Sequence, residues 1–133
     1  MVCGGVTECV FPAMIPRWRF AAAIACGDAF IRKPSERDPS VPVMLAELME
    51  EAGLPKGILQ VVHGDKGAVD AMLDNPVIQS VGSVASTPVA EYIYGSGFCN
   101  GKRVQCFRGD KNHLIICPDP ELGQAATHML GAG

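Results

Sequence analysis

The chain has 133 residues, of which 11 are Lys or Arg and 14 are Asp or Glu, so its formal net charge is −3 at pH 7. This length fits one domain, and the slightly acidic balance excludes the large basic field with which proteins bind nucleic-acid backbones. Hydrophobic residues make up 48% and charged residues 19% of the chain, a composition that excludes a disordered protein.

The hydropathy pattern and the N-terminal residues indicate neither a membrane protein nor an exported one. No apolar run approaches the ~18–20 residues that cross a bilayer. The segment Met1–Val6 lacks the basic and long apolar stretches of a secretory signal, and it is not Arg-rich like a mitochondrial presequence. We therefore expect a cytoplasmic protein without a membrane partner, or a mitochondrial one if the source is a eukaryote.

The cysteines and histidines show no metal-ligand spacing. The six cysteines form no C-x-x-C pair, and the three histidines stand far apart. The sequence therefore predicts reduced cysteines that pack as small apolar side chains, and no metal site.

Helix-like and strand-like segments alternate along the first half of the chain, separated by glycine and proline. The elements predicted there are a helix over Met14–Cys26 that Gly27 ends, a strand over Ala29–Arg32, a turn over Lys33–Arg37, and a helix that Ser40 caps and Gly53 ends.

The second half continues the alternation. The elements predicted there are a strand over Ile58–Val62, a helix over Lys66–Leu73, a strand over Val77–Val81, a helix from Thr87 to about Tyr94 that Gly95-Ser96-Gly97 closes, strands over Val104–Phe107 and His113–Cys117, and a helix over Pro120–Leu130 that Asp119 caps. Such alternation predicts an α/β fold with a mostly parallel sheet and helices on both faces. Ligands of such folds bind beyond the carboxyl ends of the strands.

Two of the loops at strand ends carry candidate chemistry. In Gly82–Thr87 a strand enters a helix, and small residues there let a phosphate approach the first helical amides, although most such segments are simply turns. In Lys33–Arg37 a lysine and a glutamate stand three residues apart. Together they can bind both hydroxyls of a ribose, and the alternative is an exposed ion pair of little consequence.

Five short segments follow one another in a distinctive order and spacing, namely Phe11–Pro16, Lys33–Arg37, Glu51–Gly57, Val61–Gly64 and Lys111–His113. Together they resemble the NAD-binding domain of the aldehyde dehydrogenase superfamily. The combination of Ser35-Glu36-Arg37 with Gly101–Gln105 and Lys111–His113 is similar to the CoA-acylating methylmalonate-semialdehyde dehydrogenases.

The resemblance implies one partial, Rossmann-like NAD-binding domain over residues 1–133, with a small-molecule dinucleotide as ligand. The family oxidises malonate and methylmalonate semialdehydes to acetyl-CoA and propionyl-CoA, with NAD as the hydride acceptor and CoA as the co-substrate. Its cysteine thiolate attacks the aldehyde, and CoA then takes the acyl group from the thioester.

The resemblance also implies cofactor-binding positions. Lys33 and Glu36 match the pair that binds the adenosine ribose, Arg37 matches an additional basic contact of the subfamily, and Ser86 matches the serine that faces the pyrophosphate. The remaining positions that match the family's cofactor lining are Thr7, Cys9 and Arg108, although the family usually has other residues at the last two.

Several residues depart from the family pattern. Val10 stands where the family has its oxyanion asparagine, Ala85 replaces a glycine of the phosphate segment, and Asp110 adds a negative charge. The chain stops at Gly133, before the region where the nucleophilic cysteine is expected, and no cysteine present matches it. We therefore predict no catalytic residue, weak or vestigial NAD binding, and a chain that is inactive alone.

Three functions stay open at this point. The first is part of a semialdehyde dehydrogenase, the second a non-catalytic nucleotide-binding or subunit-interaction module, and the third a vestigial gene product. In each case the missing partners of the sheet predict self-association or a homo-oligomer.

Overall fold

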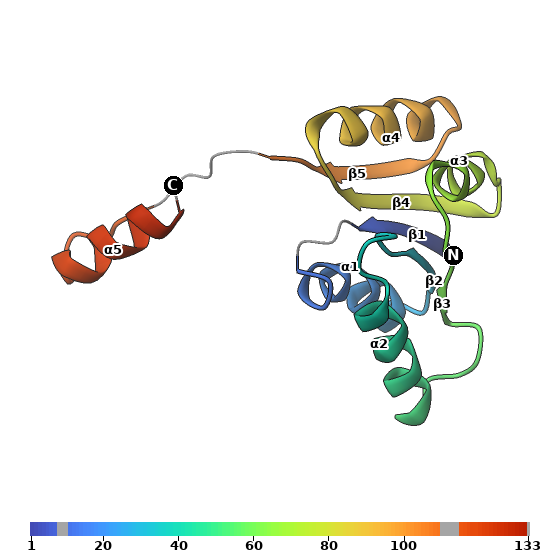
Figure 1. The fold of residues 1–133 in the computed structure, drawn as a ribbon, viewed down its shortest axis with the longest axis horizontal. Helices are drawn as coiled ribbons and strands as arrows, with labels where there is room; N and C mark the ends of the chain where they lie inside the picture. Colours follow the sequence, from blue (N-terminus) through green and yellow to red (C-terminus); the bar gives the residue numbers. More distant parts are fainter. Residues whose placement is uncertain (8–10, 110–114, 133) are drawn as a thin grey trace.

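Five parallel strands form one sheet in the part of the chain that the computed structural model describes, which is residues 1–7, 11–109 and 115–132 (Figure 1). The order across the sheet is β3-β2-β1-β4-β5. The strands are β1 (Val2–Thr7), β2 (Ala29–Lys33), β3 (Leu59–Val61), β4 (Ile78–Val84) and β5 (Arg103–Phe107).

Helices cover both faces of the sheet, as predicted for an α/β fold. One face carries α1 (Met14–Ala25) and α2 (Ser40–Glu51), and the other carries α3 (Lys66–Asp74) and α4 (Thr87–Cys99) (Figure 1). The last helix, α5 (Leu122–Ala132), stands apart from the sheet. The buried core is correspondingly divided. Phe20 of α1 packs with Phe30 of β2 on one face, and a larger cluster on the other face includes Leu73 of α3, Val81 of β4 and Ile93 of α4.

The central strand β1 was not predicted, because two consecutive glycines interrupt its apolar pattern. Their small size is what the sheet centre requires. A Cβ on Gly4 would lie 2.7 Å from Met72 Cε on one face, and a Cβ on Gly5 would lie 2.5 Å from Phe30 Cζ on the other. The glycines therefore let side chains from both layers pack directly on the backbone of β1.

The predicted end of the fourth helix at Gly95-Ser96-Gly97 is wrong, because α4 continues to Cys99. Gly97 is buried, and a Cβ there would lie 2.7 Å from Val104 Cγ2. This glycine thus allows α4 to approach β5 closely. The helix ends instead before Gly101, whose φ of 70° suits a residue without a side chain.

Two predicted helix caps are also wrong. Ser40 is the first residue of α2 and makes no capping bond. For α5, the Glu121 carboxylate accepts hydrogen bonds from the Gly123 and Gln124 amides, at 3.1 and 2.6 Å, so Glu121 takes the role expected of Asp119.

The strand expected over His113–Cys117 is not formed in its described part, residues 115–117, and its first two residues lie outside the described ranges. The other predicted helices and strands are present and, apart from the longer α4, their ends differ by up to three residues. Within those ranges, no helix is long and apolar enough to span a bilayer.

Candidate functional site

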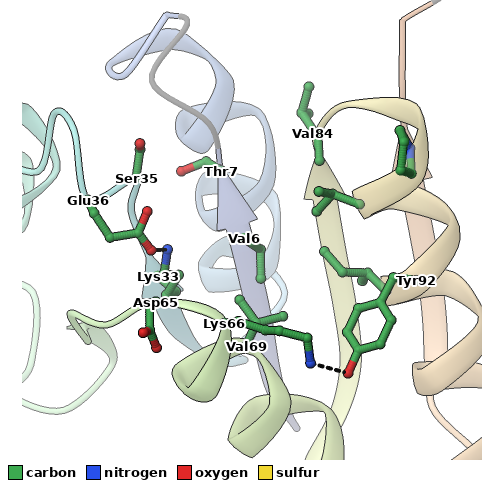
Figure 2. Close-up of a pocket in the computed structure, with 14 residues that line it drawn as sticks. Val6, Thr7, Lys33, Ser35, Glu36, Asp65, Lys66, Val69, Val84 and Tyr92 are labelled. Carbon is green, nitrogen blue, oxygen red and sulfur yellow. Dashed lines mark hydrogen bonds and ion pairs between the residues drawn. The ribbon is translucent and has the colours of Figure 1, made fainter.

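A pocket of about 420 Å³ opens at the carboxyl ends of β1, β2 and β4, between α3 and α4 (Figure 2). Its volume is in the range of small-molecule sites. Both loops that the sequence analysis selected contribute to it, through Lys33 and Glu36 after β2 and through Ala85 after β4, and Asp65 before α3 also lines it. In an open parallel sheet this edge is the expected place for a ligand.

The first polar feature of the pocket is the ion pair between Lys33 and Glu36, which Figure 2 shows. Lys33 ends β2 and its side chain is only 5% exposed, whereas the Glu36 side chain is 53% exposed. Pro34 stiffens the short turn between them. The hydrogen bond from Lys33 lowers the pKa of the Glu36 carboxyl below its usual value. A buried cation therefore fixes a charged carboxylate at the pocket edge, where the carboxylate can still accept further hydrogen bonds.

The second feature is the hydroxyl of Thr7, the last residue of the central strand. Thr7 is 4% exposed, and its Oγ1 has no hydrogen-bond partner among the described residues. Leaving a buried hydroxyl without a partner costs about 1–3 kcal/mol. In Figure 2 this oxygen lies on the side of β1 that faces Ser35 and Glu36. A polar ligand group that entered here would satisfy it.

The third feature is the beginning of α4. Ser86, its N-cap residue, is exposed and is not among the residues that line the pocket, although Pro88 and Val89 of the first turn are, and its side chain makes no capping bond to that turn. The amides of that turn carry a partial positive charge that favours an anion. The preceding amide, that of Ala85, donates instead to the Phe107 carbonyl oxygen at 3.1 Å. An anion would therefore be held by the helix end and not by the Ala85 amide.

A group that the sequence analysis missed lies at the mouth of the pocket. Lys66 begins α3, and its Nζ donates to Asp70 Oδ2 at 2.7 Å and to the Tyr92 hydroxyl at 2.8 Å. The hydrogen bonds to Asp70 and, next, to Tyr92 raise the pKa of the Lys66 ammonium to about 12. The i, i+4 spacing of Lys66 and Asp70 is visible in the sequence, but nothing local in the sequence places Tyr92 beside them.

A family model described as the aldehyde dehydrogenase family matches residues 2–133. The chain belongs to this family. Among curated proteins, the malonate-semialdehyde dehydrogenase of Pseudomonas aeruginosa is 54% identical over 131 residues, which cover 98% of this chain and 26% of that protein. Malonate-semialdehyde dehydrogenase 1 of Bacillus licheniformis is 49% identical over 131 residues, with 98% and 27% covered. The chain thus spans about a quarter of the length of these aldehyde dehydrogenases.

Solved structures agree with the family assignment. A Sinorhizobium meliloti protein, named for methylmalonate-semialdehyde dehydrogenase and crystallised with NAD, matches with a TM-score of 0.86 and 64% identity, covering 99% of this chain and 27% of that one. The methylmalonate-semialdehyde dehydrogenase of Oceanimonas doudoroffii matches with a TM-score of 0.86 and 50% identity, covering 98% and 27%. The predicted resemblance to this branch of the aldehyde dehydrogenases is confirmed, as is the α/β fold.

Not every position that resembles an aldehyde dehydrogenase cofactor contact lies at the pocket. Arg37 is exposed and does not line it; its backbone amide donates to Ser35 Oγ at 3.3 Å. Arg108 follows β5, forms an ion pair with Glu91 at 2.8 Å and lines a different pocket beside α4. Cys9 lies outside the described residues.

The aldehyde dehydrogenase chain has no grouping of three or more metal-ligating side chains in the part that the structure describes. The described cysteines are all free thiols, of which Cys3 is buried. Burial is the largest cause that raises the pKa of the Cys3 thiol above its usual value. Its thiolate form is therefore disfavoured, which suits a residue that packs under α1 rather than a nucleophile.

Proposed function

We propose that these residues bind the adenosine and pyrophosphate of NAD in an NAD-dependent, CoA-acylating malonate- or methylmalonate-semialdehyde dehydrogenase. The observation that carries the proposal is the meeting of the Lys33–Glu36 pair and the unpartnered Thr7 hydroxyl in one pocket. The relative from S. meliloti that was crystallised with NAD supports the choice of cofactor. In such a reaction NAD accepts the hydride from the substrate, and CoA receives the acyl group.

The adenosine ribose is assigned to the Lys33–Glu36 pair. An ionised carboxylate accepts two hydrogen bonds from neighbouring hydroxyls, and Glu36 is exposed enough to do so. Lys33 is held in place by burial, so it can donate to the same hydroxyls without a large loss of side-chain entropy. A 2′-phosphate, as in NADP, would instead face the negative charge of Glu36. NAD is therefore expected to bind at least as well as NADP.

The adenine base is assigned to the apolar slot between α3 and α4, where Val69, Val89 and Ile93 line the pocket. The pyrophosphate then lies toward the first turn of α4, at Ser86. Because the Ala85 amide is already bonded to Phe107, this phosphate contact is reduced to the helix end. Affinity is accordingly expected to be near 1 mM, equivalent to about −4 kcal/mol.

Titration of AMP, NAD and NADP, followed by NMR chemical shifts of the 133-residue chain, tests the proposal. AMP and NAD should shift the signals of Thr7 and Lys33, and Glu36→Ala should weaken AMP binding about tenfold by removing charge-assisted bonds. Glu91→Ala is the matched control, since it removes another exposed carboxylate that is paired with a cation, in the other pocket. Equal AMP binding by Glu36→Ala and the wild type would contradict the ribose assignment.

A further inference from the structure

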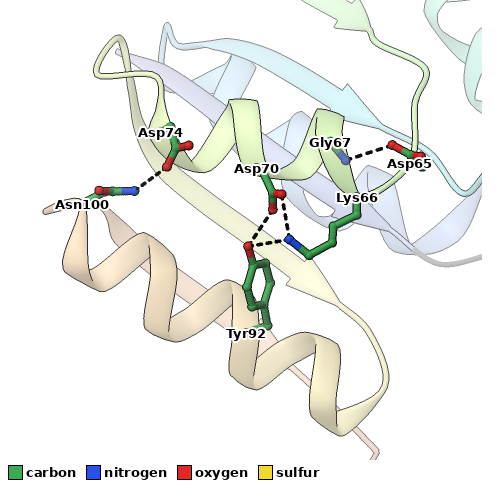
Figure 3. Close-up of polar contacts among 7 residues, drawn as sticks. All are labelled: Asp65, Lys66, Gly67, Asp70, Asp74, Tyr92 and Asn100. Atoms are coloured by element: carbon green, nitrogen blue, oxygen red, sulfur yellow. Dashed lines mark hydrogen bonds and ion pairs between the residues drawn. The ribbon is translucent and has the colours of Figure 1, made fainter.

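Three side chains close a ring of polar contacts between α3 and α4 at the mouth of the pocket (Figure 3). Lys66 Nζ donates to both Asp70 and Tyr92, and the Tyr92 hydroxyl donates to Asp70 Oδ1 at 2.7 Å. Lys66 Nζ also lies 4.3 Å from the centroid of the Tyr92 ring, within the range of a cation–π contact. The hydroxyl and the ring of Tyr92 are therefore both fixed by the same lysine.

A second polar link joins the same helices at their other ends, as Figure 3 also shows. Asn100 Nδ2 donates to the Leu73 carbonyl oxygen and to Asp74 Oδ1, each at 3.0 Å. Here the link is supported by close packing, because Leu73 is 1% exposed and buried Gly97 brings α4 close to it. The link at the pocket mouth lies at the surface instead, since Lys66 and Tyr92 are exposed, although Val69 and Ile93 of the same core lie next to it.

This difference gives the two links different roles. Removing the Asn100 contacts would leave the helices held together by the core beneath them. Removing the Tyr92 hydroxyl would instead release an exposed aromatic side chain that lines the pocket. Both Lys66 and Tyr92 line that pocket, next to Val69 and Ile93.

We infer that the Lys66–Asp70–Tyr92 ring of contacts positions the Tyr92 side chain as the outer wall of the adenine slot, and so sets the affinity for the base of the nucleotide. The inference rests on the proposed function, because it takes the occupant of the slot to be adenine. Tyr92 is a positioning residue in this scheme, and Lys66 acts through it. Because the aromatic ring of Tyr92 is already held in one position, it loses little conformational entropy when a planar base packs against it, and this favours binding.

The test compares Tyr92→Phe with the wild type, because this variant keeps the ring and removes only the hydroxyl. AMP affinity should fall about two- to fivefold, the range expected for an exposed polar link. Saturation-transfer NMR of AMP supplies a readout that a purely structural role would not move. The signal transferred to adenine H2 and H8, relative to ribose H1′, should fall in Tyr92→Phe. Lys66→Met should give the same change.

Asn100→Ala is the matched control, because it removes the other link between the same two helices. It should lower the melting temperature and leave the AMP affinity and the H2/H8 to H1′ ratio unchanged. If Tyr92→Phe bound AMP with the same affinity as the wild type, this inference would be overturned but the proposed function would not. A wild-type chain that binds no AMP would overturn both. An equal loss in Tyr92→Phe and Asn100→Ala would show that the link is structural, and it too would overturn the inference.

Discussion

Two arginines lie on the face of the sheet that α1 covers, and they differ in how well their donors are satisfied. Arg32 is 1% exposed; its Nη2 donates to the Pro12 carbonyl oxygen at 2.7 Å, but its Nε has no partner among the described residues. Burial lowers the pKa of Arg32 to about 10. The folded chain thus holds a cation at a site that disfavours charge.

Replacing Arg32 by methionine should therefore stabilise the chain. Arg32→Met removes the desolvated charge while keeping much of the buried volume. Replacing a buried ion pair by apolar side chains of similar volume often adds about 1–4 kcal/mol to the free energy of unfolding, and we expect a change of the same sign here. Because the Pro12 carbonyl loses its partner, we expect the lower end of that range. Urea unfolding followed by circular dichroism measures the change.

Arg19→Met is the comparison, and it should change stability in the opposite direction. The Arg19 Nη2 donates to the Ser83 carbonyl oxygen at 2.7 Å, and its guanidinium lies 5.2 Å from the centroid of the Phe107 ring, above the space that Gly82 leaves open. Losing these contacts should cost about 1–3 kcal/mol. A lower unfolding free energy in Arg32→Met than in the wild type would show that the bond to Pro12 outweighs the desolvation of the charge.

The candidate site could be predicted from the sequence where its residues are neighbours in the chain. Lys33 and Glu36 lie in one turn, so their spacing left open a ribose-binding pair or an exposed ion pair, and the family resemblance pointed to the first. Tyr92 is 26 residues from Lys66, and only the packing of α3 beside α4 brings them together. That the Thr7 hydroxyl has no hydrogen-bond partner among the described residues is likewise visible only in the folded sheet.

Glycine has two different structural roles in this chain, and this explains why the fold could be predicted only in part. In β1 and α4 it permits close packing, whereas at Gly27 and Gly53 it has positive φ values of 84° and 99° and follows the end of a helix. A local sequence pattern does not separate these uses, because the separating fact is what a Cβ would touch. The alternation of helix and strand, which needs no such knowledge, was predicted correctly from α1 to β5.

Helix α4 offers a direct test of this distinction within three residues. Gly97→Ala would place a Cβ 2.7 Å from Val104 Cγ2 and 3.4 Å from Leu73 Cδ2, whereas a Cβ on Gly95 would meet nothing within 4 Å. Gly97→Ala should lower the free energy of unfolding by about 1–3 kcal/mol through overpacking. Gly95→Ala should raise it by up to about 1 kcal/mol, because alanine is the better helix former.

Thermal and urea unfolding of these two variants beside the wild type measures the difference. If both substitutions stabilised the chain, α4 would not depend on close contact with β5 at Gly97. If both substitutions destabilised the chain, α4 would not extend past Gly95 in solution. The helix would then end where the sequence analysis predicted.

The molecule as a whole exposes large apolar side chains in several places. Trp18 on α1, Phe98 on α4 and Leu130 on α5 are 63%, 69% and 84% exposed, and α5 stands apart from the sheet (Figure 1). Exposed apolar surface of this extent is typical of regions that another surface covers. It spans both faces of the sheet, so more than one covering element or subunit is expected.

The isolated chain should therefore self-associate or bind a hydrophobic dye while folded. Light scattering across a concentration series should give a mass above that of one chain, and dye fluorescence should rise without denaturant. Trp18→Ser with Phe98→Ser should reduce both signals, whereas Ser96→Ala, a change at a partly buried position on α4, should reduce neither. A monomer that melts cooperatively and takes up no dye would contradict this expectation.

The strand order also bears on how the chain folds during synthesis. β1 is made before the other four strands of this sheet, yet it lies at the sheet centre, where Val2 pairs with Ile78 and Thr7 with Val84. Contacts between residues so distant in sequence form late, because a long loop must close before they are gained. On the ribosome, β1 and β2 emerge long before β4 and are left with an open edge in the meantime. The half of the pocket that holds Lys33 and Glu36 can thus assemble early, while the half built on α4 must wait until the residues up to Cys99 have been translated.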